Sequence, residues 1–206
     1  MWKFRGYAWL LGATLLCALP SGVAQPLAGA GFDVERSWLG FEVRTRFGQR
    51  LMGEFPRYEG RVETLPDGRH RVHLRVATGE AVIPDRPRYT SWMHGQSFFD
   101  SVRYPWMEFV SDPYSPALLR EGGPLKGRLS LRGVTRDEEL RVLPAPCLQP
   151  GRDCDIQVVG AIERADYGMR EWQFALTGEV RLEVRVRLRG AVERGDAGAG
   201  GPDGVG

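Results

Sequence analysis

The sequence contains few residues of the kinds that build metal or redox centres. Its 206 residues include only three histidines and three cysteines. His70 and His73 stand three apart in a strand-like run, so their side chains point to opposite faces and do not form a metal-binding pair. His94 has no cysteine or carboxylate at ligand spacing. We therefore predict no metal ion and no cofactor.

Familiar catalytic motifs are also missing. The chain has neither a Gly-x-Ser-x-Gly elbow nor a glycine-rich loop that could hold phosphate at the start of a helix. Asp100 and Glu108 could be proposed as an acid–base pair, but their separation in sequence gives little support, and a turn-capping role suits Asp100 better. We predict that the protein is not an enzyme.

The first residues have the pattern of a secretory signal peptide. Lys3 and Arg5 precede an apolar run from residue 7 to 19 that is too short for a comfortable membrane span. We predict a signal peptide over residues 1–24, with cleavage after Ala24 or, alternatively, after Ala30. An uncleaved anchor is the other interpretation. With cleavage, the pattern predicts a secreted protein.

Charge is almost balanced, which bears on the kind of partner. The chain has 28 Lys and Arg residues against 26 Asp and Glu residues, and loss of Lys3 and Arg5 with the leader leaves 26 against 26. A neutral chain argues against a nucleic-acid partner.

The two cysteines outside the leader predict a disulfide. Cys147 and Cys154 flank Pro150-Gly151, a strong turn signal, and an exported chain meets an oxidising compartment. We interpret the predicted bond as a structural staple on a long hairpin.

Alternating apolar and polar residues dominate the rest of the chain. The plainest run is 180–188, where valines and leucines fall on one face and arginines and Glu183 on the other. Similar runs separated by turn signals predict an antiparallel sandwich or barrel, with one short helix near 86–97. Gly127 and Gly160 within strands permit bends or a closely approaching ligand. Residues 31–190 form the predicted domain, and the Gly-rich residues 191–206 are predicted to be a disordered tail.

The segment from His94 to Ser111 is the most unusual stretch. Two adjacent phenylalanines, Phe98 and Phe99, cannot face the same side of one strand, but both can reach apolar surroundings from a turn. Pro105 suits the start of a strand over 106–111. The segment is either a loop that plugs the core or a lid whose aromatic side chains line a pocket.

Five motifs, in order, resemble those of the YceI-like family. The most distinctive is Phe98–Ser111, which reads Phe-Phe-Asp-Ser-Val-Arg-Tyr-Pro-Trp-Met-Glu-Phe-Val-Ser. The others are Ser37–Val43, the Gly-Glu-Phe at 53–55 followed by Gly60, Gly127–Thr135 and Arg164–Met169. The resemblance runs from about residue 32 to 189, which is nearly the whole predicted domain.

The resemblance implies an all-β fold, an antiparallel lipocalin-like β-barrel of about eight strands, a size at which one small ligand fits inside. It also implies a periplasmic location and binding of a polyprenyl chain or an isoprenoid quinone. Family members often carry a His after the first motif and an Asp before Phe-Phe-Asp, where this chain has Thr45-Arg46 and Trp92-Met93. That departure puts the head-group preference in question.

Side chains expected to line the barrel interior are apolar; ordinary core is the better interpretation of each one singly, but as a set some of them must line the interior. Head-group candidates are His94 and Arg164, with an Arg164–Asp166 ion pair as the plainer alternative for the arginine. The predicted ligand-binding residues are Phe41, Val43, Phe55, Leu74, Val76, Met93, Phe98, Phe99, Phe109, Leu129, Leu131, Val158, Leu182, Val184 and Val186.

The sequence therefore predicts a periplasmic protein that sequesters or transports a long-chain isoprenoid lipid inside a β-barrel, with transient membrane contact as a further possibility. A polyprenyl tail needs only an apolar lumen, with specificity from a few polar groups at its mouth. Two alternatives stay open. One is an envelope interaction or stress protein with a filled barrel, and the other is an enzyme that acts on a bound lipid.

Overall fold

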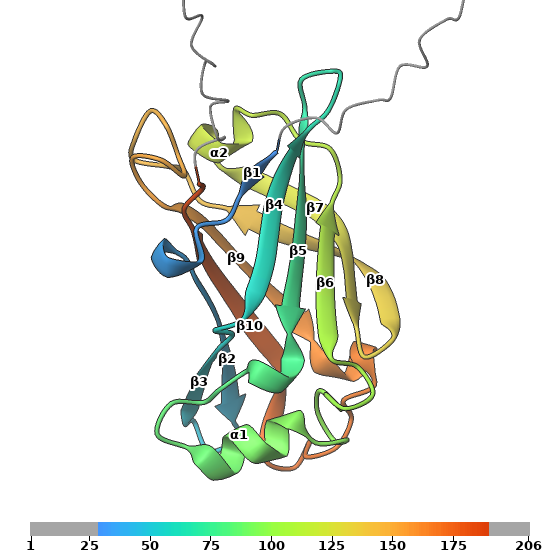
Figure 1. Ribbon diagram of the computed structural model, residues 1–206. Coiled ribbons are helices and arrows are strands. Elements are labelled where there is room, and N and C mark those ends of the chain that lie inside the picture. The colour runs from blue at the N-terminus through green and yellow to red at the C-terminus, as the bar shows by residue number, and fades with distance from the viewer. Residues whose placement is uncertain (1–28, 190–206) are drawn as a thin grey trace, which may run out of the picture.

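A computed structural model describes residues 29–189 (Figure 1). The predicted signal peptide over 1–24 and the predicted tail over 191–206 lie outside the described residues. Within residues 29–189, no helix is long and apolar enough to cross a membrane.

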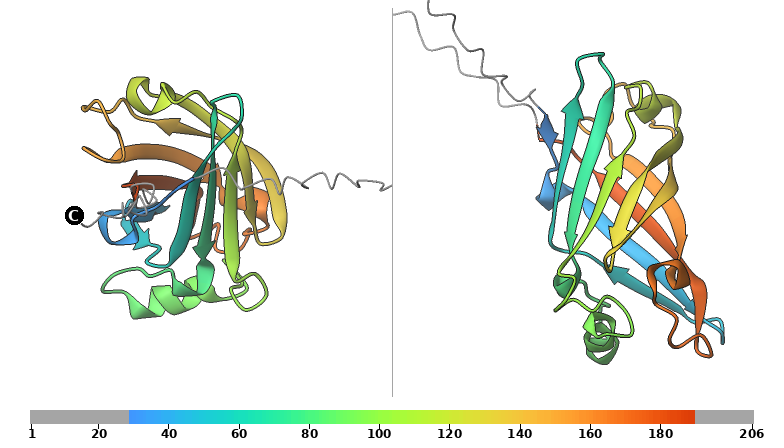
Figure 2. Two further views of the ribbon diagram at one scale, coloured as in Figure 1. Left: turned by 45° about the horizontal axis from the view of Figure 1, so that its top comes forward. Right: turned by 90° about the vertical axis from the view of Figure 1, so that its right-hand side faces the viewer.

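A single antiparallel sheet makes up most of the described chain and curls into a half-barrel (Figures 1 and 2). Neighbours follow the order β1-β4-β5-β6-β7-β8-β9-β10-β2-β3. The lipocalin-like fold implied by the resemblance is confirmed, with ten strands where about eight were expected; β1 has only two residues. The strands are β1 (Ala30–Gly31), β2 (Trp38–Thr45), β3 (Arg50–Glu54), β4 (Tyr58–Thr64), β5 (His70–Ala77), β6 (Trp106–Ser111), β7 (Gly123–Leu131), β8 (Val134–Val142), β9 (Ile156–Glu163) and β10 (Leu176–Val186).

Alternation in β10 shows how the sequence sets the two faces of the sheet. Leu182 pairs in register with Phe41 of β2 and Gly160 of β9, and its side chain joins the apolar core. On the outer face, Arg181 and Arg185 form ion pairs with Glu179 and Glu183, two residues earlier on the strand. A two-residue period thus gives each strand one apolar and one charged face.

Two glycines make room for large neighbours in the sheet. A Cβ atom on Gly160 would lie 2.3 Å from the Leu140 side chain, and one on Gly127 would lie 2.7 Å from the Phe109 ring. These glycines therefore admit side chains of adjacent strands, which is the close approach that a strand glycine allows.

Short helices and three 3-10 turns lie at the ends of the sheet. α1 (Pro87–His94) confirms the helix expected near 86–97, and its first residue is a proline, which suits that position. It lies across the end of the half-barrel at which β2 ends and β10 begins (Figure 1). The others are α2 (Leu118–Glu121) and the 3-10 turns η1 (Val34–Arg36), η2 (Thr78–Glu80) and η3 (Arg164–Tyr167).

The opposite end is tied together by the N-terminal segment and the disulfide. β1 pairs with β4, and the next residue, Phe32, bridges to Leu188 after β10. The predicted Cys147–Cys154 disulfide is confirmed in the connection between β8 and β9, with a Cα–Cα distance of 6.1 Å. At this end, backbone pairing therefore joins the edges of the half-barrel, and the disulfide braces the β8–β9 loop.

Candidate functional site

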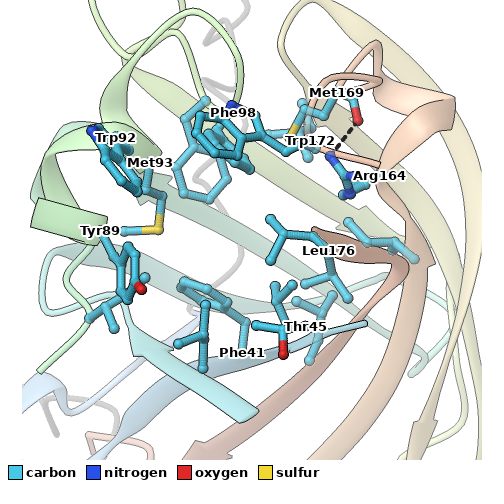
Figure 3. Close-up of a pocket in the computed structure, with 18 of the residues that line it drawn as sticks. Phe41, Thr45, Tyr89, Trp92, Met93, Phe98, Arg164, Met169, Trp172 and Leu176 are labelled. Carbon is cyan, nitrogen blue, oxygen red and sulfur yellow. Dashed lines mark hydrogen bonds between the residues drawn. The ribbon is translucent and has the colours of Figure 1, made fainter. Parts of the chain in front are cut away.

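An apolar cavity of about 230 Å³ lies inside the half-barrel at the α1 end (Figure 3). Strands β2, β3 and β10 form one wall, and α1 with the turn after it forms another. We call it the main cavity. Its lining residues are Phe41, Val43, Thr45, Leu51, Phe55, Ile83, Tyr89, Trp92, Met93, Phe98, Phe99, Met107, Leu131, Ile162, Arg164, Met169, Trp172, Ala175, Leu176, Val180 and Leu182.

Phe98 and Phe99 both line the main cavity because they lie in a turn. The backbone N–H of Phe99 donates to the carbonyl of Met93, which folds the chain back beneath α1. The Phe99 ring then packs on Phe55 and Phe41, with centroid separations of 5.9 and 6.4 Å. The two phenylalanines thus form part of the wall of an open space, and Phe99 also belongs to the buried core, so each of the two alternatives for this segment describes part of what is seen.

Two smaller cavities, of about 60 Å³ each, continue the hollow toward the disulfide end. The first shares Phe55, Met107 and Leu182 with the main cavity. The second shares Leu74 and Phe109, among others, with the first. The lumen is consequently elongated but divided by a few side chains, of which Met107 is the most flexible by its chemistry.

All fifteen apolar residues predicted to bind a ligand face this divided lumen. Eight line the main cavity, and the other seven line the two smaller ones. The eight are Phe41, Val43, Phe55, Met93, Phe98, Phe99, Leu131 and Leu182, and the seven are Leu74, Val76, Phe109, Leu129, Val158, Val184 and Val186. Their contact with a ligand stays a prediction.

Arg164 is the one charged residue in the wall of the main cavity, and it is only 2% exposed. Its Nε donates to the Thr177 carbonyl at 3.1 Å, and its Nη1 donates to the carbonyls of Met169 and Glu171 at 2.8 and 2.6 Å. Nη2 is buried and has no hydrogen-bond partner in the described chain. Burial lowers the pKa of the Arg164 guanidinium, although an arginine stays protonated at neutral pH.

The alternative Arg164–Asp166 ion pair is not formed. Asp166 instead lies 3.5 Å from Arg136 on β8. None of the ion pairs within residues 29–189 includes Arg164. The guanidinium therefore keeps both N–H donors of Nη2 unused and has no carboxylate paired with it, so Nη2 could donate to an oxygen atom of a ligand.

His94, the other head-group candidate, is occupied elsewhere. Its Nε2 lies 2.7 Å from the carbonyl oxygen of Ala81, and the residue is not among those that line the main cavity. Consecutive helical residues point about 100° apart, so His94 faces away from the cavity that its neighbour Met93 lines. The structure thus assigns His94 to holding α1 against the segment before it.

Several lining residues were not predicted from the sequence. Ile162 and Val180 continue alternating runs, so strand periodicity could have identified them. Trp172 could not be identified in this way, because it lies in an irregular loop, has a φ of +63° and stacks on Trp92 from α1 with ring centroids 5.4 Å apart. Contacts between segments so far apart in sequence leave no local signal.

The chemistry of the main cavity suits an apolar molecule with a small polar end. No carboxylate and no histidine belongs to its lining, in which Thr45, Tyr89 and Arg164 carry the main polar groups besides the two tryptophan N–H groups. Residues 29–189 also hold no cluster of three or more potential metal ligands.

Comparisons with known proteins place the fold. The family model of the YceI-like domain matches residues 31–191. BcnA from Burkholderia cenocepacia has a similar structure, with 19% identity over 75% of this chain and 98% of that one and a TM-score of 0.62. A polyisoprenoid-binding domain from Saccharophagus degradans is 17% identical over 78% of this chain and 97% of that one, with a TM-score of 0.58.

A YceI protein from Campylobacter jejuni is 18% identical over 66% of this chain and 84% of that one, with a TM-score of 0.51. No curated protein matches the sequence. At these identities the structural likenesses establish the fold alone.

Proposed function

The chain belongs to the YceI-like family, and we propose on that premise that it is a periplasmic protein that sequesters or carries one long-chain isoprenoid lipid, a polyprenyl chain or an isoprenoid quinone. The observation that carries the proposal is the elongated apolar lumen behind Phe98 and Phe99. The polyisoprenoid binding stated for the similar domain from Saccharophagus degradans gives further support.

An isoprenoid tail suits this lumen because neither forms hydrogen bonds. Apolar burial yields about 25 cal/mol per Å², so a long tail supplies binding energy without directed contacts. The main cavity, at about 230 Å³, is small beside the 300 to 1,000 Å³ typical of ligand pockets. A full-length tail therefore requires Met107 and its neighbours to move aside and join the three cavities, which a flexible thioether side chain allows.

Arg164 is the proposed contact for the polar end of the lipid. Arg164 is the one charged residue in the wall of the main cavity and its Nη2 is buried without a partner, so a hydrogen bond to a carbonyl, hydroxyl or phosphate oxygen would satisfy that donor. The tail would then extend from Arg164 along the lumen toward the two smaller cavities.

A comparison of two ligands tests this role. Replacing Arg164→Lys keeps the charge but removes the guanidinium fork, so we expect affinity for an isoprenoid quinone to fall about tenfold. Squalene, a hydrocarbon without a head group, should bind the variant and the unchanged protein equally. Equal losses for both ligands would show that Arg164 only supports the loop through Met169 and Glu171.

Export to the periplasm is consistent with the disulfide and the family. Of the two proposed cleavage sites, the position after Ala24 keeps strand β1 whole. A cut after Ala30 would remove one of the two residues through which β1 pairs with β4, since Ala30 pairs with Val62. We therefore propose cleavage after Ala24, which N-terminal sequencing of the exported protein can check.

Extraction of the purified protein with organic solvent, followed by mass spectrometry, tests the main proposal. We expect one isoprenoid per chain. Absence of lipid from protein purified from its own periplasm, and failure to take up added polyprenol or quinone, would favour the interaction protein with a filled barrel. Conversion of the added lipid into a product would favour the enzyme.

A further inference from the structure

The loops around the main cavity expose an unusual amount of apolar surface. We define the entrance rim as residues 46–50, 84–104 and 170–175, which surround the α1 end of the half-barrel (Figure 1). Four of the seven large apolar residues exposed in the described chain belong to it. They are Phe47, Trp92, Val102 and Phe174, exposed by 86%, 43%, 97% and 76%.

The aromatic side chains of the rim form a connected surface. Trp172 stacks on both Trp92 and Phe174, with centroid separations of 5.4 and 5.7 Å. The turn that carries Phe47 is held beside this stack, because the backbone N–H of Arg46 donates to the backbone carbonyl of Ala175 at 2.9 Å. Trp92 and Trp172 also line the main cavity, so the exposed aromatic surface continues into the lumen.

Arginines surround these aromatic residues. The rim has six of them, Arg46, Arg50, Arg86, Arg88, Arg103 and Arg170, against three carboxylates, Asp85, Asp100 and Glu171. None of the six takes part in an ion pair within residues 29–189. The described chain as a whole has 25 Lys and Arg residues against 23 Asp and Glu residues, an excess of two basic residues. The rim alone has an excess of three, so positive charge is concentrated there.

We propose that the entrance rim docks on the surface of an anionic lipid bilayer. Trp and other aromatic side chains favour the boundary between head groups and acyl chains, while arginines are attracted to anionic head groups. The charge complementarity and the continuity of the aromatic surface with the lumen both favour a bilayer. Docking in this orientation would let a lipid tail pass between membrane and protein without crossing water.

Sedimentation with vesicles tests the docking. Vesicles of phosphatidylethanolamine with about a quarter phosphatidylglycerol should bind the protein at low salt, and phosphatidylcholine vesicles should bind it at least tenfold less, because arginines gain only from anionic head groups. In the double variant Phe47→Asp, Phe174→Asp, we expect binding to the anionic vesicles to fall at least tenfold, since two exposed rings are lost and two negative charges added.

A matched control comes from the other end of the molecule. Leu148, which is 83% exposed in the disulfide loop, is changed in Leu148→Asp, and this variant should bind vesicles nearly as well as the unchanged protein. Circular dichroism melting curves confirm that both variants are folded. Equal loss in the two variants, or no binding of the unchanged protein to anionic vesicles, would overturn the docking proposal. Binding is measured without added isoprenoid, so this result stands apart from the lipid extraction.

Discussion

The two ends of the half-barrel differ in packing, in charge and in how they are held. At the α1 end, the main cavity has a volume of about 230 Å³ and is covered by side chains on α1 and loops. At the disulfide end, the smaller cavity has a volume of about 60 Å³. The entrance rim has six arginines against three carboxylates. The loops at the other end, residues 65–69, 112–122 and 143–155, have three arginines against five carboxylates.

We infer from this difference that one end gives stability and the other gives a ligand access. At the disulfide end, the pairing of β1 with β4 and the Phe32–Leu188 bridge close the structure, and the Cys147–Cys154 bond braces the β8–β9 loop. At the α1 end, closure depends on stacked aromatic rings and single hydrogen bonds, which can separate at a small free-energy cost. We expect a ligand to enter at the α1 end, where these weaker contacts form the closure.

Truncation of one phenylalanine at each end should give the largest contrast. Phe32 is buried and its ring packs directly over Gly60, so Phe32→Ala should lower the free energy of unfolding of the lipid-free protein by about 3 to 5 kcal/mol. Phe98 already borders empty space, and Phe98→Ala should lower it by less than about 2 kcal/mol. Urea unfolding measures both values, and equal losses would remove the distinction between a packed and an open end.

Removal of the disulfide should weaken only the closed end. The bond joins residues seven apart in sequence. Loop-closure entropy for a ring of that size predicts that Cys147→Ser, Cys154→Ser lowers the free energy of unfolding by about 2 to 3 kcal/mol. Lipid uptake at the α1 end, followed by fluorescence of Trp92 and Trp172, should keep its affinity. A large loss of lipid affinity in the folded variant would show that the two ends are coupled.

A smaller effect is expected from pH. His70 lies at the disulfide end against Tyr114, and burial lowers the pKa of its imidazole below the usual 6.5. The native state therefore holds His70 neutral while the unfolded chain takes up a proton. The free energy of unfolding should accordingly be highest above pH 6.5 and should fall as the pH drops from 6.5 through the lowered pKa of His70. We expect this loss to be less than about 1 kcal/mol. The dependence should disappear in His70→Gln, as unfolding at pH 5 and pH 8 can show.

Much of the fold follows from strand periodicity. The alternation in 180–188 identified β10 and its inward face, because a two-residue period is visible in sequence. β8 has no such signal, since its middle reads Arg-Asp-Glu-Glu. The position of β8 in the sheet is set by its continuous pairing with β7. Glu138 of β8 also accepts a hydrogen bond from the Tyr167 hydroxyl. Backbone pairing thus forms a strand that hydropathy does not reveal.

The candidate site was predictable on the sheet and not in the loops. Phe41 and Leu182 follow from alternation, and Phe98 with Phe99 from a motif. His94 was proposed for its chemistry alone, and only the direction of α1 shows that it faces Ala81. Trp172 depends on a stack with Trp92 that joins segments about eighty residues apart, and sequence reading detects no such contact.

Native mass spectrometry of two tryptophan variants tests the central claim most directly. Leu182 faces the lumen where the main cavity meets the next one, and Glu183 lies on the outer face of the same strand. After incubation with a polyprenol, the unchanged protein and Glu183→Trp should each gain the mass of one lipid, whereas Leu182→Trp should gain none. Equal uptake by Leu182→Trp and Glu183→Trp would contradict a lipid site inside the half-barrel.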